Sequence, residues 1–347
     1  QRKELVIAAP AAGTVETFDL RPGDLVAPNQ PVATLLESGQ LWVRVFVPEP
    51  SLSKVPLGLA VTVTVDGEGD RPGERHRGPG ARFHVDGKAT FDAERMKVPS
   101  FLPDLPGTRM DLAEYYTAVE RLDRGVGLIL DDLKASGQLE QTLIIFLSDN
   151  GVPMPNAKTN LYDASVRLPM IARVPGTKVG VVSQAMISYV DLVPTMLEWA
   201  SAKGPTYALP GRSFLSVVGQ TEPAGWDRVF VSHTFHGVSM YYPMRGVRTR
   251  QYKYLRNLAP ELTFPHATDL SGSPTWQGFA KSGEKIYGRR KIDAYLHRPV
   301  EELYDITKDP DEVTNLAGSA EHAPVLAKLR AEVDAWRKAT KDPWKEN

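Results

Sequence analysis

Two oxygen-bearing side chains and a lysine follow an apolar run and could do chemistry together. The run covers residues 142–147 and leads into Asp149 and Asn150, with Lys158 shortly after. Open α/β sheets bind ligands at the ends of such strands. Carboxylate and amide oxygens suit a hard cation such as calcium, and a lysine supplies a point charge for an anionic substrate. The Asp-Asn-Gly sequence is equally typical of an ordinary turn, so the local residues leave both interpretations open.

The composition is that of an ordinary globular protein and excludes several kinds of site. The chain has 347 residues, 42% hydrophobic and 24% charged, with a net charge of −1. This balance gives no argument for a nucleic-acid partner. The absence of cysteine excludes disulfides, thiolate metal sites and a cysteine nucleophile. No apolar run reaches the ~20 residues of a transmembrane segment. The chain begins Gln1-Arg2-Lys3 without a signal-like segment, and we interpret this beginning as cut or processed.

The sequence changes character along its length, which predicts four segments. Residues 1–67 contain short β-type runs separated by turn residues and predict a small all-β segment. Residues 68–80 are rich in Gly, Pro and Arg and predict a linker. Residues 81–225 show a mixed α/β pattern, and residues 226–347 show strands followed by an amphipathic helix.

The elements around the candidate site follow from hydrophobic periodicity. Apolar residues at helical spacing from Leu112 to Leu133 predict a long helix, with Asp111 as its N-cap and Gly137 as its stop. The continuous apolar runs that follow predict strands of a partly parallel sheet that is covered on both faces. Further elements are predicted as strands at 168–174, 228–231 and 251–255, and as helices through 190–197 and 323–338.

Residues 9–15, 21–26, 41–43 and 47–49 carry a resemblance in the first segment. They resemble the membrane-fusion, or periplasmic adaptor, proteins of bacterial efflux and secretion systems. The resemblance implies the second half of a lipoyl-like hairpin module leading into a β-barrel. No lysine stands at a hairpin tip, so a lipoyl or biotinyl arm is not expected. A generic β-rich fragment is the alternative interpretation.

A series of short motifs, in a shared order from about residue 82 to the end, resembles the C-terminal half of a sulfatase. Within that family it is most similar to the heparan N-sulfatase (N-sulfoglucosamine sulfohydrolase) group. The resemblance implies an alkaline-phosphatase/sulfatase-like α/β fold, here with an incomplete central sheet and a small C-terminal antiparallel sheet with a helix. It also implies a periplasmic or secreted location, glycosaminoglycan degradation and a sulfated saccharide as partner. The motifs are residues 98–104, 115–116, 122–127, 148–159, 161–163, 167–169, 242–245, 302–305, 309–310, 315–317 and 342–344.

The resemblance also assigns roles in a site. Asp149 and Asn150 would be calcium ligands, and Lys158 would contact the sulfate. The family's nucleophile is a formylglycine made from Cys or Ser in a Cys/Ser-x-Pro-x-Arg motif, and no stretch of this sequence fits it. Because two ligands are few for calcium, which takes about six to eight oxygens, we expect weak or absent calcium binding and no activity in this chain alone. Asp131 and Asp132, at the end of a helix, are expected to be a solvated charge pair and not replacement ligands.

Two other groups of residues are candidates for substrate binding. His233 and His236 lie three apart, which fits a polar loop better than a zinc site. The family resemblance implies that this loop lines the substrate pocket. A basic run that alternates with apolar residues predicts the exposed face of a strand, with contact to an acidic saccharide as the alternative. The run consists of Arg245, Arg248, Arg250, Lys253 and Arg256.

Three functional hypotheses follow. The first is a sulfatase-family hydrolase of sulfate or sulfamate groups on sugars, inactive alone because the nucleophile is missing. The second is a non-catalytic module that binds sulfated glycans. The third is an efflux or secretion adaptor accessory in which the sulfatase-like part only packs. An uncovered edge of the incomplete sheet would also favour oligomerisation.

Overall fold

The computed structural model describes residues 13–17, 34–37, 90–236 and 240–344, and the chain divides into two compact units, residues 1–70 and 71–347. In the first unit, β1 (Gly13–Thr17) pairs antiparallel with β2 (Thr34–Glu37). The other strands predicted in this segment and the linker at 68–80 lie outside the described residues. The adaptor-like fold and the predicted domain boundaries therefore stay predictions.

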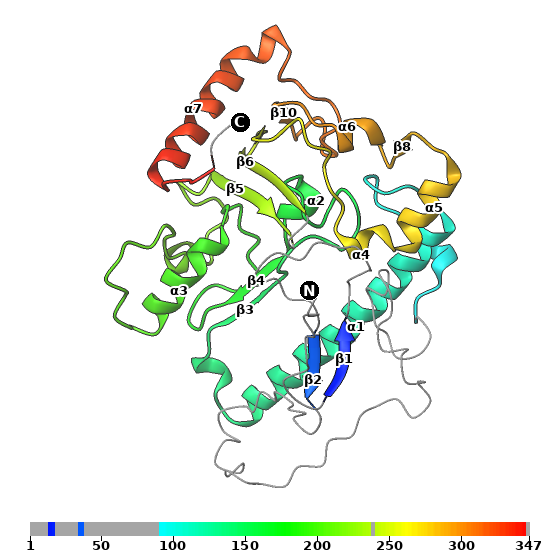
Figure 1. Cartoon of the computed structure of the whole chain (residues 1–347). Helices are drawn as coiled ribbons and strands as arrows, with labels where there is room; N and C mark the ends of the chain where they lie inside the picture. The colour runs from blue at the N-terminus through cyan, green and yellow to red at the C-terminus, as the bar shows by residue number, and fades with distance from the viewer. Residues whose placement is uncertain (1–12, 18–33, 38–89, 237–239, 345–347) are drawn as a thin grey trace, which may run out of the picture. The chain divides into compact units, whose positions relative to one another are not determined.

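The second unit begins with a long helix that starts earlier than predicted. Helix α1 (Pro106–Ala135) has Pro106 at its first turn, where a missing N–H is no loss (Figure 1). The prediction of Asp111 as its N-cap is wrong, because Asp111 is buried inside the helix. Its carboxylate accepts hydrogen bonds from the backbone N–H and hydroxyl of Thr275, at the start of α5 (Pro274–Ser282). Gly137 adopts a φ of 71° just beyond the helix end, as predicted.

The strand that precedes the candidate site pairs differently from the prediction. β3 (Ile144–Leu147) and β4 (Met170–Arg173) form a two-stranded sheet, and their pairing is antiparallel. The predicted partly parallel sheet is therefore wrong for the described residues. One face of this pair, including Ile145 and Ala172, packs against a cluster that contains Phe214 and Trp226. The antiparallel pairing places the end of β3 beside the start of β4.

The predicted C-terminal antiparallel sheet with a closing helix is confirmed. Its strand order is β10-β7-β6-β5, and all three pairings are antiparallel. Helix α7 (Ala323–Ala339) packs on one face, where Leu329 and Val333 are buried with Val247 and Leu303. The opposite face packs against the segment 161–162, which continues from the loop after β3. The strands are β5 (Arg228–Phe235), β6 (Tyr241–Thr249), β7 (Tyr252–Asn257) and β10 (Glu301–Asp305).

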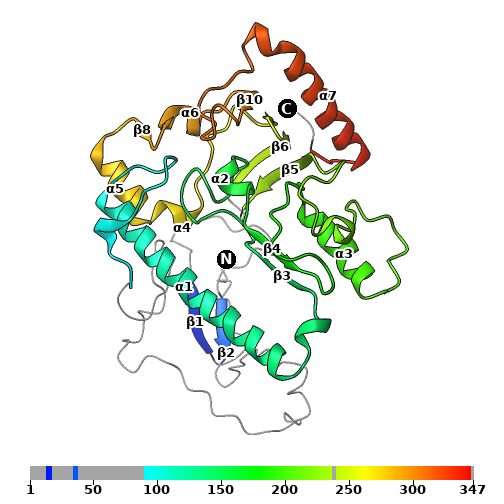
Figure 2. The same ribbon diagram turned by 180° about the vertical axis from the view of Figure 1, so that it is seen from behind.

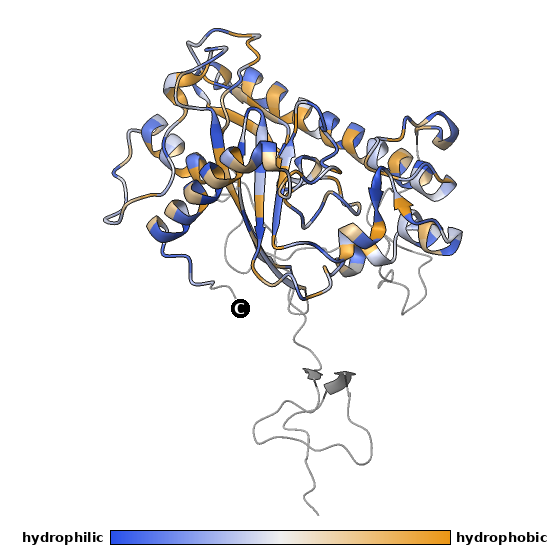
Figure 3. Ribbon diagram, turned by 90° about the horizontal axis from the view of Figure 1, so that it is seen from above, coloured by the Kyte–Doolittle hydropathy of each residue, from blue (hydrophilic) through white to orange (hydrophobic). Residues whose placement is uncertain are grey.

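Short helices and a small hairpin connect these parts (Figures 1 and 2). None of the described helices is long and apolar enough to cross a membrane, and polar residues interrupt the hydrophobic ones along the helices in Figure 3. The connecting elements are η2 (Ala93–Arg95), η3 (Leu139–Gln141), α2 (Asp163–Val166), η4 (Tyr189–Asp191), α3 (Leu192–Trp199), η5 (Leu215–Val217), α4 (Thr268–Ser271), β8 (Ile286–Tyr287), β9 (Arg290–Lys291), α6 (Ile292–Leu296) and η6 (Ala320–His322).

Candidate anion and cation site

The residues after β3 form a tight, self-bonded turn. The backbone N–H of Asn150 donates to the Asp149 carboxylate at 2.9 Å, and the Asn150 side-chain amide donates to the Gly151 carbonyl at 2.8 Å. The Ser148 hydroxyl closes the turn by donating to the Asn150 carbonyl at 2.7 Å. Asp149 is exposed and Asn150 is half-buried. The turn interpretation and the ligand interpretation are thus compatible, since the turn leaves carboxylate oxygens accessible.

The loop that continues from this turn is rigidly held. A Cβ on Gly151 would lie 2.3 Å from the carbonyl oxygen of Ala164, so only glycine fits there. The backbone N–H of Lys158 donates back to the Val152 carbonyl at 3.2 Å, which folds the loop onto itself. Asn156 and Thr159 both have positive φ, at 70° and 64°. Backbone of this kind persists only where surrounding contacts hold it, and it clusters at functional sites.

Lys158 lies at the end of the loop and forms a partly buried ion pair. Its Nζ atom lies 2.8 Å from a carboxylate oxygen of Asp269 on α4, and the two side chains are 20% and 37% exposed. Burial, and then the Asp149 charge, raise the pKa of Tyr189 in η4. Sequence reasoning missed Asp269 and Tyr189. No local signal points to Asp269, which lies 111 residues beyond Lys158.

The segment that follows Lys158 is anchored in the core. The side-chain oxygen of Asn160 accepts hydrogen bonds from the Leu161 N–H at 2.8 Å and from Arg298 at 3.0 Å. The Arg298 guanidinium is buried, 3.7 Å from the centre of the Phe264 ring. Such stacking on aromatic faces suits the weakly hydrated guanidinium. Both ends of the loop are therefore held by contacts within the protein, and these contacts need no bound ligand.

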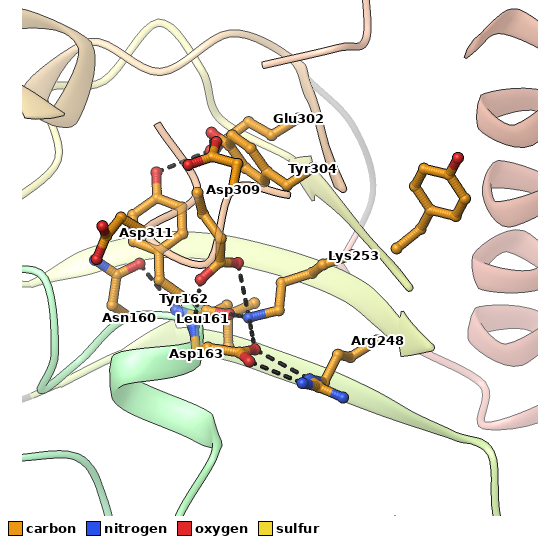
Figure 4. A network of polar contacts seen from close by, with 12 residues as sticks. Asn160, Leu161, Tyr162, Asp163, Arg248, Lys253, Glu302, Tyr304, Asp309 and Asp311 are labelled. Carbon is orange, nitrogen blue, oxygen red and sulfur yellow. Dashed lines mark hydrogen bonds and ion pairs between the residues drawn. The ribbon is translucent and has the colours of Figure 1, made fainter. Parts of the chain in front are cut away.

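A buried network of charges fixes the beginning of α2 (Figure 4). Asp163 pairs with Arg248 at 2.8 Å and also with Lys253, whose side chain is 0% exposed. Lys253 reaches Glu312 at 2.8 Å as well. Burial alone would raise the pKa of the Asp163 carboxyl, but the hydrogen bonds from Arg248 and Lys253 outweigh it and hold that pKa well below its usual range. Burial raises the pKa of the Glu312 carboxyl, whereas Asp163 stays ionised, and the network holds strands β6 and β7 to the segment below the loop.

A second buried group lies beside it. The hydroxyls of Tyr162 and Tyr304 both donate to the same carboxylate oxygen of Glu302, at 2.8 and 2.6 Å (Figure 4). The Arg290 guanidinium lies 3.9 Å from the centre of the Tyr162 ring. Burial raises the pKa of both tyrosines, so they act as hydrogen-bond donors and not as bases.

The described residues do not fit a complete calcium site. Asp149 and Asn150 offer one carboxylate and one amide oxygen, and no group of three or more His, Asp or Glu side chains within residues 90–236 and 240–344 is arranged to hold a metal. Calcium takes about six to eight oxygen ligands. Two side chains can contribute to a cation site but cannot close one, and weak or absent calcium binding stays a prediction. Asp131 and Asp132 are exposed on α1, as expected for a solvated pair.

The histidines predicted to line a pocket differ in environment. His233 lies within β5, not after it, and its Nδ1 atom is 3.1 Å from the Tyr242 carbonyl oxygen. Burial lowers the pKa of His233, so it is neutral at pH 7. His236 is exposed, just beyond the end of β5. No contact to a substrate follows from these positions, and their role stays a prediction.

The basic run does not form the exposed face of a strand. Arg245 is 4% exposed and pairs with Asp342 at 2.8 Å, while its guanidinium also donates to the His233 carbonyl. Lys253 is fully buried in the network described above. The prediction of an exposed strand face is therefore wrong. Strands β6 and β7 are central in their sheet. Their basic side chains form ion pairs with carboxylates from distant segments, Arg248 with Asp163 and Arg256 with Asp334.

Comparison with protein families confirms the sulfatase resemblance. Residues 73–202 match the sulfatase family model, and residues 156–274 match the model of the C-terminal region of N-sulphoglucosamine sulphohydrolase. Human N-sulphoglucosamine sulphohydrolase is 38% identical over 266 residues, which cover 73% of this chain and 53% of that protein. This part of the chain is homologous to sulfatases, and the chain spans about half the length of the curated relatives it matches. The adaptor resemblance of the first segment stays a prediction.

Solved structures show the same fold. A putative sulfatase, yidJ from Bacteroides fragilis, superimposes with a TM-score of 0.52 at 22% identity, over 74% of this chain and 49% of its own. A protein solved in complex with its substrate, D-glucosamine-2-N,6-O-disulfate, gives a TM-score of 0.52 at 23% identity, over 68% of this chain and 42% of its own. The described α/β part therefore has a sulfatase-type fold. The matched region covers less than half of each neighbour's own chain.

Proposed function

We propose that this chain carries one side of a site for sulfate or sulfamate groups on sugars of the N-sulfoglucosamine type. The observation that carries the proposal is the rigid loop from residue 148 to 158, which presents Asp149 and Asn150 at one end and Lys158 at the other. The sequence similarity to human N-sulphoglucosamine sulphohydrolase supports the choice of substrate class.

Each side chain would have a limited role that its chemistry defines. Lys158 would contact an anionic oxygen of the substrate, since a partly buried ammonium attracts an anion more strongly than an exposed one does. To do so it must exchange its partner Asp269 for the substrate. Asp149 and Asn150 would offer two oxygens to a cation such as calcium, which balances anionic charge where it is bound. Periplasmic or secreted location stays part of this proposal.

We propose further that the 347 residues bind such a group without hydrolysing it. The sequence contains no cysteine and no Ser-x-Pro-x-Arg stretch that could supply the nucleophile of the family. Covalent catalysis needs an activated nucleophile next to the bound group, and the hydroxyls of Ser148 and Thr159 donate to backbone carbonyls of the loop and have no general base as partner. This favours the second candidate function, a non-catalytic module for sulfated glycans.

The test is release of sulfate from N-sulfoglucosamine and from an aryl sulfate by the purified chain, with and without calcium. We expect no release above buffer. Turnover that disappears in Asp149→Ala would show that the chain is an active hydrolase. Turnover that persists in Asp149→Ala would indicate a contaminating enzyme and would leave the assay to be repeated on repurified protein.

A further inference from the structure

Asp269 places a carboxylate directly beside the proposed anion contact. One of its oxygens lies 2.8 Å from the Nζ atom of Lys158, and its side chain is 37% exposed, so a ligand that reaches Lys158 also meets Asp269. Ion pairs at partly exposed positions contribute little to stability. The loop does not need this pair to hold its shape, since the Lys158 N–H already donates to the Val152 carbonyl. The pair is therefore available for ligand recognition.

The element that carries Asp269 is anchored in the core. Leu270 follows Asp269 in α4, and its side chain is fully buried. The buried hydroxyl of Ser273 donates to the Leu270 carbonyl at 2.9 Å and accepts the N–H of Trp276 in α5 at 3.0 Å. The backbone that carries Asp269 is therefore fixed, and its carboxylate stays within reach of a group bound to Lys158.

A sulfonate group bound to Lys158 would bring its anionic oxygens next to the Asp269 carboxylate. Two anions in contact repel each other, and an ionised carboxylate accepts hydrogen bonds but donates none. The carboxylate is satisfied only by a ligand that carries a hydrogen-bond donor next to its anionic oxygens. In a sulfamate, the atom that joins sulfur to the sugar is a nitrogen with an N–H group. In a sulfate ester, that atom is an oxygen without a hydrogen.

We infer that Asp269 selects sulfamates over sulfate esters at this site. The inference rests on the proposed function, in which Lys158 contacts the anionic oxygens. The Lys158 ammonium holds a sulfonate oxygen while the Asp269 carboxylate accepts the adjacent N–H, so both members of the ion pair find a partner on one ligand.

A sulfate ester would leave the Asp269 carboxylate facing oxygen lone pairs. Sites that hydrogen-bond a substrate N–H reject analogues that lack it, because a polar group of the protein is left unpaired. Water can still reach this pair, since both side chains are partly exposed. The preference for the sulfamate is therefore about tenfold, which is smaller than in a closed site.

Isothermal titration of the full chain with N-sulfoglucosamine and with glucose 2-sulfate, in the presence of calcium, tests the inference. The two sugars differ only in the atom, nitrogen or oxygen, that joins sulfur to the ring. The unaltered chain should bind N-sulfoglucosamine about tenfold more tightly. Asp269→Asn should bind the two sugars equally, because an amide side chain can both donate and accept. Asp269→Ala, which does neither, is the second variant and should also lose the preference. Asp293→Asn removes an exposed carboxylate of α6 and should keep it.

Lys158→Ala separates this inference from the proposed function, because it should weaken the binding of both sugars. If it does so while the unaltered chain binds the two sugars equally, the proposed function stands and the inference is wrong. A preference that persists in both Asp269→Asn and Asp269→Ala would also overturn the inference, since another group would then recognise the N–H. Binding of neither sugar, or affinities that Lys158→Ala leaves unaltered, would overturn the proposed function and the inference with it.

Discussion

Gly151 and Lys158 are the residues on which the candidate site depends most, for different reasons. Position 151 must be a glycine because the backbone of α2 leaves no room for a side chain there. Lys158 is required by charge, and its ion pair with Asp269 shows that its ammonium is already placed to accept an anion. A substrate sulfate would compete with a carboxylate that is always present, so the affinity for the free anion is expected to be modest.

Gly151→Ala is the sharpest single change at the site. The added methyl group would collide with backbone atoms of Ala164 and Ser165, which cannot move as a flexible side chain could. We expect a loss of stability of about 1–3 kcal/mol, as for other overpacked sites. Gly127→Ala is the matched control, because the added methyl group meets nothing in the structure. It should stabilise the helix by about 0.5–1 kcal/mol. Equal effects of the two variants in urea unfolding would contradict this account.

His266 predicts a dependence of stability on pH. Its ring lies between Trp276 and Tyr295, and burial lowers its pKa from 6.5 to about 4. The unfolded chain therefore takes up a proton below pH 6.5 while the folded chain does not. The stability is fully present above that pH and falls as the pH drops toward 4, by roughly 3 kcal/mol.

The variant His266→Phe removes this titration while keeping an aromatic ring. Its free energy of unfolding should change less between pH 7 and pH 4 than that of the unaltered chain. Urea unfolding at several pH values measures both. An unchanged pH dependence in the variant would mean that other groups cause the loss of stability.

At the scale of elements, the charged network beneath α2 anchors the segment that follows the site loop. Asp163 follows the site loop by five residues and receives both Arg248 and Lys253. Asp163→Asn would leave the fully buried Lys253 with Glu312 as its one carboxylate partner, beside the Leu161 carbonyl. We expect a loss of about 3–5 kcal/mol, as for other buried pairs deprived of one partner. Asp293→Asn, at an exposed pair with His297, is the control and should unfold like the unaltered chain.

The sequence predicted elements better than it predicted their partners. The helix that ends just before Gly137, the strand before Asp149, the strands at 228–231 and 251–255 and the closing helix follow from periodicity and stop signals, whereas β10 was not predicted. The antiparallel pairing of β3 with β4 did not, because a short apolar run does not reveal the direction of its neighbour. The burial of Arg245 and Lys253 was also missed, since their carboxylate partners lie up to 97 residues away.

On the scale of the whole molecule, stability is distributed unevenly. The C-terminal sheet buries aromatic and aliphatic side chains on both faces, while β3 and β4 contain no fully buried residue. We therefore expect the region from Leu112 to Met196 to be the weak part of the isolated chain, prone to association through its strand edges. Hydrogen exchange should be faster at residues 144–147 than at residues 244–247. Uniformly slow exchange in a monodisperse monomer would show that the two-stranded sheet is self-sufficient.

The central claim is that the loop from residue 148 to 158 binds a sulfated sugar through Lys158. Isothermal titration of the chain with N-sulfoglucosamine, in the presence of calcium, measures this directly. We expect binding that is absent with unsulfated glucosamine, about tenfold weaker in Lys158→Ala, and unchanged in Lys281→Ala, which removes an exposed lysine of α5. Equal affinity for the sulfated and unsulfated sugars, or an affinity that Lys158→Ala leaves unaltered, would contradict the claim.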